Sequence, residues 1–142
     1  MSRTPVAMLL VRAGPRRVAL TLEHLVEVVD PGMPIGVPAR QPALRGLTTV
    51  RGQLVPLVHL GALLDGGACP AAVGDAGVVI AVGDRRICLE VEAVEEVVRE
   101  PALPVPAGET LPWALGVTRA SGGLVPVLDI PALGGRLVEG GS

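Results

Sequence analysis

The side chains that could take part in catalysis are few in this chain of 142 residues. His24 and His59 are the only histidines, and their surroundings match no metal-binding spacing. Cys69 and Cys88 could each supply a nucleophilic thiol if the fold placed one of them beside His59, although no catalytic signature surrounds either cysteine. The sequence therefore favours a protein that is not an enzyme, with a small enzyme that uses His59 as the alternative.

A group of glutamates is the other feature that could do chemistry, because clustered carboxylates can bind a hard cation. The group consists of Glu90, Glu92, Glu95 and Glu96. These residues alternate with apolar ones, namely Leu89, Val91, Val94 and Val97. Such a pattern is more typical of a solvated face opposite an apolar face. We therefore expect no metal, and since no phosphate-binding glycine loop or nucleophile elbow occurs, we also expect no cofactor.

The composition excludes several further classes of function. The net charge is −2, all twelve basic residues are arginines, and Trp113 is the only aromatic residue, so nucleic-acid binding is not expected. No apolar stretch is long enough to span a membrane, and two cysteines suit a reducing compartment better than a disulfide framework. A cytoplasmic protein is expected. Its mean hydropathy of +0.55 is high, and we interpret the excess as surface for a partner.

The elements that position these residues occur twice, because the chain is an internal duplication. The segments 16–29 and 85–98 share seven of fourteen residues, and the segments 46–63 and 116–133 share eight of eighteen. The first repeat covers about 7–64 and the second about 76–133. In this alignment Arg51 falls on Ser121 and His59 falls on Asp129, whereas most of the framework positions around them agree.

Each repeat predicts four or five short strands separated by glycine and proline. Strands are expected at 8–11, 18–22, 46–50 and 54–60, and at 78–82, 87–91, 116–120 and 124–130. Apolar spacing of three and four residues predicts a short helical turn after the second strand of each repeat. Proline-rich segments follow, and these must wrap an edge or link strands because proline lacks an amide donor. The fold class is mainly β, with two small barrels that share one core.

The ordered set of four segments at 20–29, 43–64, 78–98 and 115–134 resembles the CheW family of chemotaxis coupling proteins. The resemblance covers about residues 6–137. It implies one CheW-like domain over residues 1–142, built as two five-stranded β-barrel subdomains with short helical segments and with strands exchanged between the two halves of the chain.

The resemblance also implies a function without catalysis. Such proteins are adaptors in bacterial chemosensory arrays: they bind the signalling tip of methyl-accepting receptors and the regulatory domain of the histidine kinase CheA, and other CheW-like proteins are further partners. It places a receptor-binding groove at Leu22, Leu25, Glu27, Val28, Gly46 and Arg51, with Glu27 and Arg51 paired across it. No catalytic residue, metal or membrane insertion is implied, and the expected location is cytoplasmic, in receptor clusters.

The sequence departs from the family pattern mainly at the rim of the first barrel. Thr49 and Val50 precede the Arg-Gly turn, His59 replaces the usual aspartate, and Gly61 stands where a charged residue is common. We interpret these changes as a divergent coupling protein that keeps the receptor groove while its contact with the kinase is weakened. The alternative is a structural or regulatory component of the array.

Overall fold

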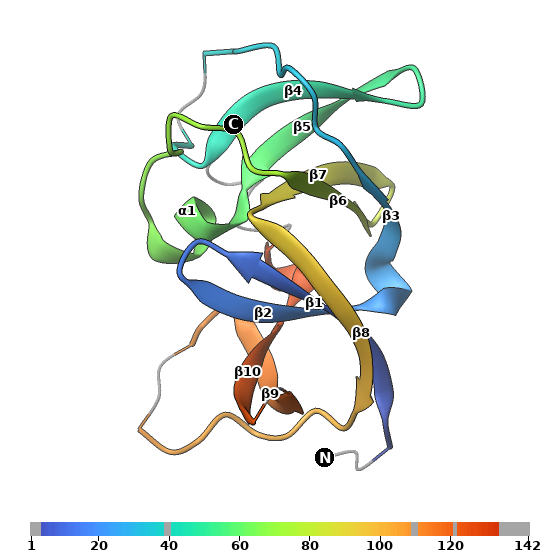
Figure 1. Ribbon diagram of the computed structural model, residues 1–142, viewed down its shortest axis with the longest axis vertical. Coiled ribbons are helices and arrows are strands. Elements are labelled where there is room, and N and C mark those ends of the chain that lie inside the picture. The colour runs from blue at the N-terminus through green and yellow to red at the C-terminus, as the bar shows by residue number, and fades with distance from the viewer. Residues whose placement is uncertain (1–3, 39–40, 109–110, 121, 134–142) are drawn as a thin grey trace.

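A computed structural model describes residues 4–38, 41–108, 111–120 and 122–133 of the chain. The described residues form ten strands and two named short helices, η1 and α1 (Figure 1). In the first half of the chain these are β1 (Val6–Ala13), β2 (Arg16–Thr21), η1 (Leu22–His24), β3 (Leu25–Val29), β4 (Leu44–Val50), β5 (Gln53–His59) and α1 (Leu60–Asp65). In the second half they are β6 (Ala76–Val82), β7 (Arg85–Val91), β8 (Ala93–Glu100), β9 (Ala114–Ala120) and β10 (Gly123–Leu128).

The strands form two five-stranded sheets, with the orders β8-β1-β2-β10-β9 and β3-β6-β7-β5-β4. We call them the first and the second sheet. Each sheet combines the first two strands of one half of the chain with the last three strands of the other half. The β4–β5 hairpin and the β9–β10 hairpin consequently lie at opposite ends of the molecule (Figure 1). The mainly β fold class with two five-stranded units is confirmed.

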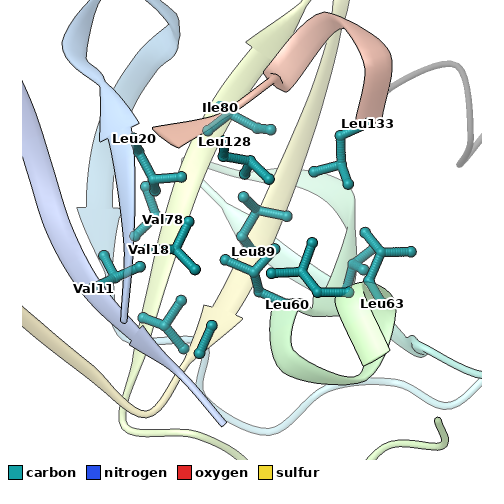
Figure 2. Close-up of a cluster of buried hydrophobic side chains, with 14 of the residues drawn as sticks. Val11, Val18, Leu20, Leu60, Leu63, Val78, Ile80, Leu89, Leu128 and Leu133 are labelled. Carbon is teal, nitrogen blue, oxygen red and sulfur yellow. The ribbon is translucent and has the colours of Figure 1, made fainter. Parts of the chain in front are cut away.

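The central strands are apolar on both faces because each face packs into a different core. Leu9, Val11 and Ala13 of β1 enter a large cluster between the two sheets, part of which Figure 2 shows. The alternate residues Met8 and Leu10 enter a smaller cluster on the other face of the first sheet. Side chains of successive strand residues point to opposite faces, so a strand buried on both sides reads as a continuous apolar run.

The proline-rich segments lie along the outer strands, as the lack of an amide donor in proline predicts. Ile35 exchanges two backbone hydrogen bonds of 2.8 Å with Leu47 of β4. In the second half of the chain, Leu103 bonds Val117 of β9 in the same way. The hydroxyls of Thr48 and its repeat counterpart Thr118 donate to the carbonyl oxygens of Pro31 and Pro101. One outer strand of each sheet, β4 or β9, is thus covered by the segment that follows the third strand of a repeat.

The helices differ from expectation at two places, and one prediction, a helical turn after the second strand of the second repeat, is wrong. In the second half a single residue separates the end of β7 from the start of β8, so no helical turn forms there, whereas the first half has the three-residue η1. The amide of the intervening Glu92 donates instead to the carbonyl oxygen of Arg12. Helix α1 was not expected. It follows β5 directly, begins at a cap formed by the His59 ring, and ends at Gly66, whose φ of 76° suits glycine.

Most of the large apolar side chains are inside, in the three clusters that the two sheets create. The exposed large ones are scattered over several elements: Val26, Val28, Met33, Ile35, Leu54, Val97, Leu115 and Leu124. The shared core therefore accounts for most of the high mean hydropathy. This corrects the interpretation of the excess as surface for a partner. Within the described residues, no helix has both the length and the apolar character that crossing a membrane requires.

Candidate functional site

The six residues proposed for the groove lie on neighbouring parts of the second sheet and at its border with the first. Leu22 is in η1, and Leu25, Glu27 and Val28 are in the edge strand β3. Gly46 is in β4, and Arg51 is in the turn between β4 and β5. β3 and β4 are the two outermost strands in the order of this sheet, so contact between their side chains requires the sheet to curl.

The expected ion pair between Glu27 and Arg51 is present. Arg51 Nε donates to Glu27 Oε2 at 2.7 Å. The Arg51 side chain is 75% exposed and that of Glu27 is 22% exposed. Exposed ion pairs add little to stability, so this one fixes the position of two charges rather than holding the fold together. Arg51 has a positive φ of 50°, which places its side chain on the tight turn before Gly52.

The apolar members of the set fall into two kinds. Leu22 and Leu25 are half-buried and pack against the core between the sheets. Val28 is 46% exposed, and of the three it is the one most available to a partner. Packing requires glycine at position 46, because a Cβ there would lie 2.1 Å from the carbonyl oxygen of Ile35. Of the six, Val28 and Arg51 thus present the most exposed side chains, and Glu27 contributes through its ion pair with Arg51.

His59 has no free ring nitrogen for proton transfer. Its Nδ1 accepts the backbone N–H of Ala62 at 3.0 Å, so the proton of the neutral ring is on Nε2, which donates to Glu92 Oε2 at 2.8 Å. Glu92 Oε1 accepts the backbone N–H of Gly14. The repeat counterpart Asp129 accepts the N–H of Ala132 in the same capping position. His59 therefore caps α1 and ties it to the β1–β2 turn.

This network predicts a response to acid. Burial opposes the charged form of Glu92, but the hydrogen bonds from Gly14 and His59 outweigh it, and the pKa of Glu92 is lowered below its ordinary value of 4.5. A lowered pKa in the folded state stabilises the fold above the unfolded pKa, and this stabilisation is lost as the pH falls through the folded value. Glu92→Gln should therefore lower the free energy of unfolding by about 1–2 kcal/mol at neutral pH.

The measurement is urea denaturation of the wild type, Glu92→Gln and Glu96→Gln between about pH 3 and pH 7. The difference between the wild type and Glu92→Gln should shrink as the pH falls below the ordinary value for glutamate. Glu96 is an exposed neighbour, so its variant is the control and should stay close to the wild type. A constant difference across this pH range would contradict the role of the Glu92 carboxylate.

Glu90 is buried rather than solvated, which corrects the interpretation of the glutamate group. Its side chain is fully buried, and Arg45 Nη2 donates to Oε2 at 2.9 Å while Arg45 Nε donates to Oε1. The pKa of Arg45 is raised, chiefly by this hydrogen bonding. Glu90 also accepts the N–H of Gly74, and Arg45 donates to the carbonyl oxygen of Ala72. The pair thereby fastens the connection between the repeats to the second sheet.

This pair was not among the predicted contacts, although the duplication contains a signal for it. Arg45 falls on Leu115 and Glu90 falls on Thr21, so neither charged residue has a charged counterpart. Two unmatched opposite charges in one repeat framework are a reason to test for a contact between them.

Neither cysteine is arranged as a nucleophile. Burial, reinforced by the charge of Glu90, raises the pKa of Cys88 to about 12, and Cys88 packs in the core of the second sheet. The Cys69 thiol donates to the carbonyl oxygens of Pro42 and Ala43, and burial raises its pKa. Among the described residues, no group of three or more potential metal ligands occurs.

Two intertwined five-stranded sheets, each built from both halves of the chain, define the class of fold. The comparisons with known proteins identify the family. The model of the CheW-like domain matches residues 7–137, and the chain belongs to the CheW family. Members of this family are scaffolding proteins without enzymatic activity.

A solved structure has the same fold. The scaffolding protein TtCheW from Thermoanaerobacter tengcongensis superposes with a TM-score of 0.78 at 17% sequence identity, over 93% of this chain and 89% of that one. Among curated proteins, none matches the sequence.

Proposed function

We propose that this protein couples methyl-accepting chemoreceptors to a CheA-type histidine kinase in a cytoplasmic chemosensory array. Membership in the CheW family supports an adaptor in such arrays. The receptor-binding site rests on one observation, the ion pair between Glu27 and Arg51. The exposed Val28 follows Glu27 on the edge strand β3, and its side chain is on the other face of that strand. The amphipathic helical hairpin of a receptor tip, lying along this edge, would contact the fixed pair of charges and the exposed valine together.

The kinase contact is the second part of the proposal. The departures at Thr49, Val50, His59 and Gly61 lie on β4, β5 and α1, whereas the two charges of the proposed receptor site lie on β3 and the β4–β5 turn. We infer a receptor contact that is retained and a contact with the kinase regulatory domain that is weaker. A structural or regulatory role in the array is the alternative, and other CheW-like proteins are further partners under either assignment.

Substitutions at the ion pair test the receptor site. Arg51→Glu places two carboxylates together and should weaken binding of a purified receptor signalling tip by about tenfold or more, with little change in the free energy of unfolding. Val28→Asp should have a similar effect, because it puts a charge in the apolar part of the contact. Calorimetric titration measures the affinity, and urea denaturation measures the stability.

The duplication supplies the control for this experiment. Val97 occupies the position of Val28 in the second repeat and is also exposed, so Val97→Asp should leave the receptor affinity unchanged. The charge swap Glu27→Arg with Arg51→Glu should recover part of the lost affinity if the geometry of the pair matters. Wild-type affinity in both Arg51→Glu and Val28→Asp would exclude this surface as the receptor site.

A further inference from the structure

A second surface lies on the first sheet, away from the ion pair of Glu27 and Arg51. Two hollows, of about 350 Å³ and about 660 Å³, adjoin at the beginning of β10. They share Ala120, Gly123 and Leu124, and together they form a trough between the β1–β2 hairpin and the β9–β10 hairpin. Leu124 is 54% exposed in the middle of the trough.

The trough exists because β2 and β10 separate. Their parallel ladder contains a single pair, Ala19 with Val127. The corresponding ladder of the second sheet, between β5 and β7, also starts directly after a proline, Pro56, but it continues for three pairs towards the end of β5. Pro126 lies next to the single pair and has no amide to extend the ladder towards the beginning of β10. The beginnings of β2 and β10 therefore line an open surface instead of pairing with each other.

The lining of the trough is strongly basic. Its charged residues are Arg12, Arg16, Arg17, Arg119 and Glu100. The whole chain has a net charge of −2, so this concentration of arginines is local. Glu95 and Asp65, just outside the lining, pair with three of these arginines, and an excess of positive charge remains that complements an acidic partner.

Much of the hydrogen-bonding capacity of these arginines is unused. Each guanidinium has five N–H donors. Among the described residues, Arg16 Nη2 donates to Asp65 and Arg17 Nε donates to Glu95, both at 2.7 Å. Arg16 is the most fully engaged of the four, because its guanidinium also lies over the Trp113 ring, 5.3 Å from the centroid, and its Nε is buried. Arg12 approaches Glu95 only to 3.7 Å. Neither Asp65 nor Glu95 is a lining residue of the trough, so most donors of Arg12, Arg17 and Arg119 are open to acceptors from outside.

We propose that this trough docks an acidic segment of a partner protein, with carboxylates on the arginines and an apolar side chain on Leu124. A free anion would use the guanidiniums but would leave the exposed leucine uncovered. A segment that carries acidic residues on both sides of one apolar residue matches the arrangement of arginines on both sides of Leu124. This docking surface is independent of the proposed receptor site, which lies on the other sheet.

Fluorescence anisotropy with a labelled twelve-residue peptide, rich in Asp and Glu on both sides of one leucine, tests the proposal. The full chain should bind this peptide saturably, and the double variant Arg12→Glu with Arg119→Glu should bind about tenfold more weakly or worse. Leu124→Asp should also weaken binding. Raising the salt to about 1 M should abolish most of it, because the Debye length then falls to about 3 Å.

The second repeat again gives a matched control. Arg85 and Arg86 hold the positions of Arg16 and Arg17 in the β6–β7 hairpin, and both are exposed. The double variant Arg85→Glu with Arg86→Glu has the same net charge as the trough variant but should keep the affinity of the wild type. Equal weakening in both double variants would mean that only net charge matters, and it would overturn the proposal.

Three other outcomes would overturn the proposal as well. The first is that the wild type does not bind the peptide, and the second is that it binds the matching Asn and Gln peptide equally well. The third is that the protein binds vesicles of anionic lipid through Arg12 and Arg119 but does not bind the peptide, which would assign the trough to a membrane surface. Because the proposed receptor site is on the second sheet, loss of receptor binding in Arg51→Glu and loss of peptide binding in the trough variant are separate results.

Discussion

Glu90→Gln should destabilise the fold by about 3–5 kcal/mol, the expected cost of leaving a buried charge without its partner. The Arg45 side chain is only 11% exposed, and Glu90 provides the carboxylate that neutralises it. The amide of glutamine keeps the size of the side chain but removes the charge and one acceptor. Chemical denaturation at neutral pH measures the free energy of unfolding of the variant and of the wild type.

The double variant Arg45→Met with Glu90→Leu separates charge from packing. It removes both buried charges, so it should recover much of the stability that the single variant loses. In Glu90→Gln the connection at residues 66–75 should also become more sensitive to proteolysis, because Ala72 and Gly74 are held by this pair. A loss of less than about 1 kcal/mol in Glu90→Gln would show that the ion pair does not hold the second sheet together.

Gly46→Ala should cost about 2–3 kcal/mol or more, because the added Cβ would overlap the chain that covers β4. Its nearest atom would be the carbonyl oxygen of Ile35, at 2.1 Å, and that residue is held by two hydrogen bonds to Leu47. Gly116→Ala should act alike, with the Leu103 carbonyl oxygen at 2.5 Å. Thermal and urea unfolding measure both variants.

Gly36→Ala is the control, because a Cβ there would meet no atom within 4 Å. It should stay within about 1 kcal/mol of the wild type. If Gly46→Ala folds with normal stability but loses receptor affinity, then Gly46 acts in binding and the packing explanation fails.

The fold could be predicted because its determinants are repeated along the chain. Turns at Gly14 and Gly83 and the hairpins around Gly52 and Gly122 come from local glycine chemistry, and both halves contain them. Apolar spacing predicts a helical turn in the second half, but the segment forms the half-exposed edge strand β8. The spacing of Val91, Val94, Val97 and Val98 does not distinguish the two cases; β8 forms because β1 pairs with it.

The site could be predicted only in part. The pairing of Glu27 with Arg51 followed from the family resemblance, and Arg51 stands out in the sequence by having Ser121 as its repeat counterpart. Arg45 and Glu90 are 45 residues apart, and their contact depends on how β4, β7 and the connection come together in three dimensions. His59 illustrates the same limit, because only the structure shows that both of its ring nitrogens are used to cap α1 and to bind Glu92.

Separate titrations of the full chain against a receptor signalling tip and against the regulatory domain of a CheA-type kinase test the coupling role most directly. We expect saturable binding of the receptor tip that Arg51→Glu weakens by about tenfold or more, together with weaker binding of the kinase domain that this variant retains. Tight kinase binding with no receptor binding would contradict this expectation.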